Sequence, residues 1–272
     1  MTRFRISVAR LAALAVLSIG IHPLSPAAAI LEERLTFQEA VQAFQQGRLA
    51  RAQEVLTDLL ESDPNHADAH MLMAMVLDMQ GEVSRAGRHF ERAVSLRPES
   101  ATARVNLGSN LIRRGEWQKA AAHFESALEM EPENATASFN LGVIRLHMEG
   151  PEEALRFFRA AYRHQPEVFE NGYQLAYCLL LLGEDRQAEE VLAGIRSVGE
   201  SRLEFQLLQG LVEHSRGREM KLDRVLEELR EASVRIPVEV LQALVNLLIS
   251  RDLLREAAPF ARRLGERMPD SQ

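Results

Sequence analysis

Residues 101–134 read ATARVNLGSNLIRRGEWQKAAAHFESALEMEPEN and end two positions after a proline. That proline, Pro132, belongs to a series: Pro64, Pro98, Pro132 and Pro166 stand 34 residues apart. A fixed period of this length is the sequence signature of a repeat array, in which each unit buries its core against its neighbours.

Small and large apolar residues alternate at fixed places inside each unit, if each is numbered with its proline at position 32. The small residues occupy positions 8 and 20, which hold Ala40, Ala74, Gly108, Gly142 and Ala52, Ala86, Ala120, Ala154. The large residues occupy position 24, which holds Leu56, Phe90, Phe124 and Phe158. Small residues let two helices approach closely, and the larger groups fill the space beside them. The pattern predicts a pair of packed helices in each unit.

The ends of these helices are marked by glycine and proline. Gly47, Gly81 and Gly115 hold position 15, where a first helix is expected to stop and the chain to turn. In the fourth unit the glycine moves to Gly150, and Pro151 after it suits the first turn of a new helix. The proline at position 32 ends the second helix, because it lacks a backbone donor.

Beyond the fourth unit the pattern weakens toward the C-terminus. A fifth unit keeps Leu175, Ala176 and Gly183 in register but has Glu200 in place of its proline. Residues 201–272 match the pattern weakly, as expected for the end of an array. The run Val238–Leu248 is more apolar than a terminal helix should leave open. Either self-association or a final helix over Leu253–Met268 is expected to cover it.

The repeated motif resembles the tetratricopeptide repeat (TPR) family, closely over Glu33–Glu200 and weakly beyond. The resemblance implies an all-α fold, a right-handed superhelical solenoid of helix-turn-helix repeats. It divides the chain into a leader (1–29), five repeats (30–200) and degenerate C-terminal repeats with a cap (201–272). Residues 36, 70, 104, 138 and 172 depart from the family, which usually has an aromatic there.

In this family the first helices line a concave face, with positions 5, 9, 12 and 13 pointing inward. The resemblance therefore implies a partner-binding groove lined by Phe37, Val41, Met71, Met75, Val105, Ser109, Ile112, Phe139, Val143, Leu146, Tyr173 and Tyr177. Positions 5, 9 and 12 share one helix face by their i, i+4 and i+7 spacing. One TPR subclass binds C-terminal carboxylates through Lys, Asn and Arg at positions 5 and 9, and none of these types occurs there in repeats one to five. An apolar groove is expected instead.

The N-terminus reads as a Sec-type signal peptide over residues 1–29. Three arginines precede the short apolar run Leu11–Ile21, and Ala27–Ala29 offer small residues for cleavage after Ala29. An uncleaved membrane anchor is the alternative, but His22 and Pro23 end the run well short of the roughly 20 residues that span a bilayer. The pattern predicts a soluble, exported, periplasmic protein without stable membrane insertion after cleavage.

Composition and motifs argue against several classes of function. The net charge of −7 gives no overall attraction to nucleic acid. No phosphate loop, H-E-x-x-H, C-x-x-C or nucleophile elbow occurs, so no enzyme, cofactor or metal is expected. Cys178 lies in an apolar helix and is expected to be buried and inert. His66 and His70 do not make a convincing metal pair, and His89 and His123 are expected on the solvated outer face.

The leading hypothesis is an exported TPR scaffold or adaptor. It would bind an amphipathic helix or an extended segment of a protein partner and assist the assembly or regulation of a bacterial envelope complex. The alternative is a homo-oligomeric structural protein that uses its groove or C-terminal helices to self-associate. An enzyme or glycan-handling protein on a TPR frame is disfavoured, because no catalytic set is present.

Overall fold

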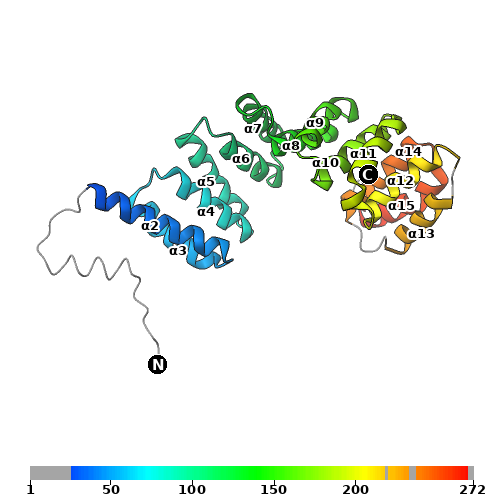
Figure 1. The fold of residues 1–272 in the computed structure, drawn as a ribbon. Coiled ribbons are helices and arrows are strands. Elements are labelled where there is room, and N and C mark those ends of the chain that lie inside the picture. Colours follow the sequence, from blue (N-terminus) through cyan, green and yellow to red (C-terminus); the bar gives the residue numbers. More distant parts are fainter. Residues whose placement is uncertain (1–25, 218–219, 233–236, 269–272) are drawn as a thin grey trace, which may run out of the picture. The chain divides into compact units, whose positions relative to one another are not determined.

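The computed structural model describes residues 26–217, 220–232 and 237–268, and all its regular elements in these ranges are α-helices. Figure 1 shows them in chain order, labelled α2 to α15. The chain divides into two compact units, residues 1–130 and 131–272. The expected all-α repeat architecture is confirmed. The predicted signal peptide covers residues 1–29. Residues 1–25 lie outside the described part of the chain, and residues 26–29 fall in α2, which begins at Pro26.

Over its described residues, 26–130, the N-terminal unit consists of three helix pairs, one for each of the first three repeats. The helices are α2 (Pro26–Gln45), α3 (Leu49–Ser62), α4 (Ala67–Met79), α5 (Val83–Leu96), α6 (Ala101–Arg113) and α7 (Trp117–Met130). Within each repeat the first helix packs on the second, and the core holds the small residues and the large apolar residues of the sequence pattern.

The C-terminal unit contains four helix pairs in the part that the structure describes. Its helices are α8 (Ala135–Met148), α9 (Pro151–His164), α10 (Phe169–Leu181), α11 (Asp185–Gly199), α12 (Leu203–His214), α13 (Met220–Ala232), α14 (Val238–Ser250) and α15 (Leu254–Arg267). The final helix predicted over Leu253–Met268 is confirmed as α15, and it packs on α14. Five apolar residues of α14 are buried: Leu241, Leu244, Val245, Leu247 and Leu248. This burial removes most of the apolar surface that motivated self-association through the C-terminal helices.

The helix ends have the glycine turns and capping hydrogen bonds that are typical of such positions. Gly81 has a φ of 81°, and the amide of Glu82 donates to the carbonyl of Leu77 at 2.9 Å. This arrangement satisfies carbonyls that the end of α4 would leave unpaired. At the following helix start, the Ser100 hydroxyl accepts from the Ala103 amide at 3.2 Å, as a capping side chain does.

Candidate partner-binding surface

The predicted groove residues fall in both units, and seven of them lie on the first helices of the N-terminal unit. We define the N-terminal first-helix surface as six apolar side chains of these helices that remain at least partly exposed, namely Phe37, Val41, Met71, Met75, Met79 and Ile112. Met79 is the most open of these, at 63% exposure. The predicted groove residue Ser109 is also partly exposed, but its hydroxyl bonds back to the Val105 carbonyl of its own helix at 3.0 Å.

Two predicted groove residues are buried. Val105 is 7% exposed and Tyr177 is 8% exposed, so neither presents a free side chain to a partner. Val105 packs inside the N-terminal unit, and Tyr177 lies inside the C-terminal unit. Helical register predicts which face of a helix a residue occupies. It does not predict which other side chains pack on that residue, so the burial of these two could not be read from the sequence.

Side-chain contacts join the first helices of the N-terminal unit. The Phe37 ring lies 5.1 Å from that of His66, which caps the start of α4. The amide of Asn106 on α6 donates to the Met71 sulfur at 3.3 Å. These contacts join α2 to the start of α4, and α4 to α6, within the N-terminal unit.

One ion pair lies beside this surface. Asp78 of α4, at groove position 12, forms an ion pair with Arg113 of α6. The Asp78 carboxylate also accepts from the side-chain amide of Asn110 at 3.4 Å. Because these charges neutralise each other within the protein, they add no net charge with which to attract a charged ligand.

A cleft of about 780 Å³ adjoins this surface in the N-terminal unit. It is lined by the middle of α2, the turn between α3 and α4 with the first residues of α4, and the end of α5. The His66 ring accepts from the Ala69 amide at 3.1 Å and lies 3.4 Å from a Glu33 carboxylate oxygen. Arg97 contacts Asp68 through both carboxylate oxygens, at 2.5 and 2.7 Å. Sequence reasoning missed this cleft, because it treated the turn between repeats as a connection.

In the C-terminal unit the fourth repeat contributes Phe139, Val143 and Leu146, which are partly buried against the apolar core. The Phe139 ring meets Phe158 edge-on, with centroids 6.0 Å apart. These side chains therefore expose only part of their area. They remain predicted groove residues.

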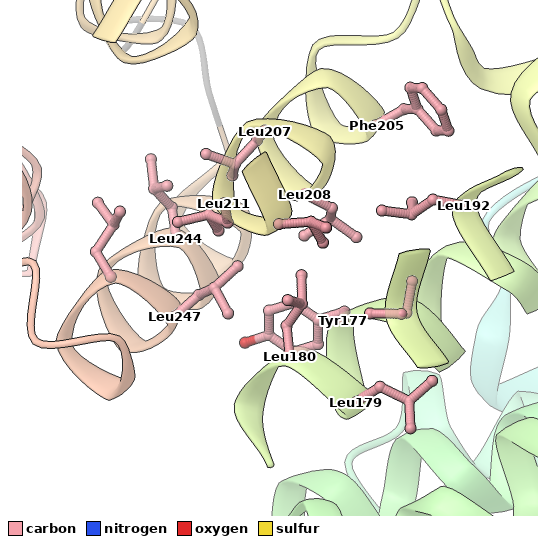
Figure 2. Close-up of a cluster of buried hydrophobic side chains, with 14 of the residues drawn as sticks. Tyr177, Leu179, Leu180, Leu192, Phe205, Leu207, Leu208, Leu211, Leu244 and Leu247 are labelled. Atoms are coloured by element: carbon pink, nitrogen blue, oxygen red, sulfur yellow. The ribbon is translucent and has the colours of Figure 1, made fainter. Parts of the chain in front are cut away.

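The fifth repeat differs, because its first helix is covered by a later segment of the chain. Tyr177 of α10 donates a hydrogen bond of 3.3 Å from its hydroxyl to the carbonyl of Ala243 in α14. Leu180, one turn further along α10, is completely buried. Figure 2 shows Tyr177 and Leu180 facing Leu247 of α14 and Leu208 of α12. The predicted groove is thus filled here by the protein itself.

The tyrosines of α10 stay uncharged at neutral pH. Burial raises the pKa of Tyr177 to about 12. Burial also raises the pKa of Tyr173 far above its usual range, with Tyr177 and Glu204 adding to the effect. Tyr173 stacks between Phe169 and Tyr177, at centroid distances of 5.7 and 6.4 Å. These rings act as packing groups.

The expectation that His89 lies on a solvated face is met only in part. His89 is half-buried, and its Nδ1 lies 3.0 Å from Nδ1 of His70. Because His70 Nε2 contacts the Pro64 carbonyl at 3.0 Å, that nitrogen must donate, and His89 then donates to His70. Burial, followed by the electrostatic effects of His70, Arg85 and Arg88, lowers the pKa of His89 to about 4.

Two features are absent from the part of the chain that the structure describes. Within these residues, no group of three or more His, Cys, Asp or Glu side chains is placed to hold a metal ion. No helix in the same residues combines the length and the hydropathy needed to cross a bilayer.

Comparison with known proteins identifies the repeats. A family model described as tetratricopeptide repeat matches residues 37–101 and 105–169. No curated protein matches the chain.

Several solved structures share the fold. The pilF protein of Pseudomonas aeruginosa has a TM-score of 0.65 at 21% identity, over 73% of this chain and 90% of its own. PilW, described as a widely conserved type IV pilus biogenesis factor, has a TM-score of 0.61 at 21% identity, over 73% and 92%. YrrB, described as a TPR protein with an unusual peptide-binding site, has a TM-score of 0.57 at 19% identity, over 77% and 99%. The chain therefore carries tetratricopeptide repeats, recognisable in residues 37–101 and 105–169, on an all-α repeat fold.

Proposed function

We propose that this protein is an exported scaffold that binds a protein or peptide partner through the N-terminal first-helix surface. The observation that carries the proposal is the partly exposed methionine row Met71, Met75 and Met79 on α4. Methionine side chains are flexible and polarisable, so they adapt to partners of varied shape. The surface is defined by apolar side chains, and the carboxylate of Asp78 beside it is already paired with Arg113.

The size of the surface indicates a weak and exchangeable contact. Fully burying one such side chain contributes about 1.5–3 kcal/mol. Because most of these side chains are already half-buried, we expect each to contribute about half of this free energy when a partner binds. Association costs several kcal/mol, which offsets much of the total. Polar contacts in the adjoining cleft, near His66 and Arg97, would then add to the affinity.

Export to the envelope is the second part of the proposal. Its support is the pattern of residues 1–29, with three arginines, a short apolar run and the small residues Ala27–Ala29. Two proteins of similar fold, pilF and PilW, are consistent with it, since PilW is described as a type IV pilus biogenesis factor. The role we infer is to assist the assembly or regulation of an envelope machine.

Site-specific crosslinking tests the binding surface. A photo-crosslinking amino acid is placed at Met79 in one variant and at Met130 in another, and each is expressed in the native cell. Met130 is the matched control, because it is also an exposed methionine of the N-terminal unit but lies at the end of a second helix. We expect a discrete protein adduct at Met79 that Met75→Glu weakens by tenfold or more. Equal adducts at Met79 and Met130 would contradict the proposal.

Self-association through the same surface is the alternative. Light scattering of the mature chain, with and without Met79→Glu, separates the two ideas. An oligomer that Met79→Glu dissociates favours self-association, and a monomer favours a foreign partner.

A further inference from the structure

The same repeat positions are partly exposed in the first repeat and covered in the fifth. Positions 9 and 12 hold Val41 and Phe44 in α2, and both are partly exposed. The equivalent residues of α10 are Tyr177 and Leu180, and both are buried. Equivalent positions of a repeat therefore differ in burial because a segment from the end of the chain lies against α10.

The covering segment is an amphipathic helix. Its buried residues Leu241, Leu244, Val245 and Leu248 follow the i, i+3, i+4, i+7 spacing of a single helix face. Val240 and Ile249, by contrast, are about half-exposed, at 49% and 50%. Figure 1 draws α14 and α15 in orange and red beside the yellow-green helices of the same unit, and α14 packs against α10. The fold thus presents a helix bound to a first-helix face.

A polar contact fixes the C-terminal end of α14 to the rim of this face. The guanidinium of Arg251 contacts an Asp185 carboxylate oxygen at 2.6 Å and the Leu180 carbonyl at 3.4 Å. Both side chains are largely shielded, with exposures of 14% for Arg251 and 26% for Asp185. We refer to this contact as the Arg251 latch.

The latch is incompletely satisfied. The second carboxylate oxygen of Asp185, Oδ1, is buried and has no hydrogen-bond partner. A shielded ion pair recovers the cost of losing water only when its remaining acceptors are also paired. The hydroxyl of Tyr177 adds one hydrogen bond, and it goes to a carbonyl in the middle of a helix. Polar contacts therefore contribute little to the attachment of α14 to α10, and apolar packing contributes most of it.

We propose that α14 and α15 form a displaceable cover over a helix-binding face of α10, closed by the Arg251 latch. The face consists of Tyr177 and Leu180, with Tyr173 one turn before them, and its ligand is an amphipathic helix with the apolar spacing of α14 and a basic residue at its C-terminal end. In the closed state α14 occupies this face beside α12. A partner helix of the same chemistry binds there when the cover opens. This inference is independent of partner binding by the N-terminal unit.

Hydrogen exchange on the full-length protein tests the cover. Arg251→Gln and Asp185→Asn each remove the ion pair with little change of shape, and Arg251→Lys keeps the charge as a control. We expect amide exchange in residues 238–267 to rise about tenfold in the first two variants, the effect of losing about 1.4 kcal/mol of local stability. Amide exchange in α9 and α10 should stay as in the unaltered protein. In the Arg251→Lys variant, exchange in residues 238–267 should also be close to that of the unaltered protein.

The thiol of Cys178 reports on the rest of the unit. It is completely buried on α10 and donates to the Pro151 carbonyl at 3.0 Å, within the core of the unit. Local opening of the cover leaves its labelling rate unchanged. A proportional rise of Cys178 labelling with α14 exchange would overturn the proposal, because α14 would then be part of one cooperative core. Unchanged exchange in α14 would overturn it as well.

A synthetic peptide of residues 238–251 tests the ligand class. Fluorescence anisotropy of the labelled peptide should show binding to the full-length Arg251→Gln protein at least tenfold tighter than to the unaltered protein. A peptide with Leu244→Pro, which cannot complete the helix, is the matched control and should not bind. Binding that ignores Arg251, or that tolerates the proline, would overturn the proposal.

Discussion

The ring of Phe124 lies directly against Gly108, so that a Cβ added to the glycine would stand 2.8 Å from the ring Cζ. These two residues hold positions 24 and 8 of the third repeat, one on each of its paired helices. The same relationship recurs in the fourth repeat, where a Cβ on Gly142 would meet Phe158 at 2.8 Å. The small-residue pattern of the sequence is therefore a steric condition for pairing the two helices.

Gly108→Ala is expected to destabilise the protein. The added methyl group must move the fully buried Phe124 ring, at a cost of about 1–3 kcal/mol. The second repeat holds Ala74 opposite Phe90, so the pair can adapt, and we expect the lower end of this range. Urea unfolding provides the measurement. Gly265→Ala is the control, because a Cβ there meets nothing within 4 Å and should be neutral or stabilising.

Gly81→Ala tests a conformational requirement. A Cβ at this glycine meets nothing within 4 Å, but its φ of 81° lies in the left-handed region. We expect a loss of about 1–2 kcal/mol, since L-residues other than glycine are strained there. Gly81→Asn should lose less, because asparagine tolerates this region. Thermal unfolding of the two variants would disprove the explanation if alanine were the better tolerated residue.

The stability of the N-terminal unit is expected to fall in mild acid. The pKa of folded His89 is lowered to about 4 by burial and by His70, Arg85 and Arg88, whereas the unfolded chain binds the proton near 6.5. Unfolding therefore takes up a proton as the pH drops below 6.5, and the stabilisation is lost progressively down to pH 4. Because water reaches part of the ring, we expect about 1 kcal/mol between pH 7 and pH 5. Urea unfolding at both values should show this loss, and His89→Gln should reduce it.

Cys178 is expected to resist thiol reagents in the folded protein. Burial raises its pKa to about 12, so the reactive thiolate is scarce at pH 8. Labelling by a chromogenic disulfide should be slow without denaturant and complete in concentrated urea. Rapid labelling of the folded protein at pH 8 would contradict the buried position.

How much the sequence predicts differs between the two ends of the chain. The helix pairs, the glycine turns and the small-to-large packing could be predicted, because each depends on residues within one unit of 34. The half-burial of His89 could not, because it depends on the Pro64 carbonyl that orients His70 in three dimensions. The cleft beside Phe37 was missed for a similar reason, since it combines three segments of different repeats.

The sequence by itself determined the repeat register, and with it the all-α fold and the residues that share a first-helix face. Only the tertiary structure decided which of these faces remain open. Tyr177 meets Ala243 and Asp185 meets Arg251 across 66 residues of chain, where the repeat pattern has already weakened. Periodicity records packing between adjacent segments, whereas the covering of α10 by α14 is a non-local contact between apolar surfaces, and nothing in the local spacing of residues specifies it.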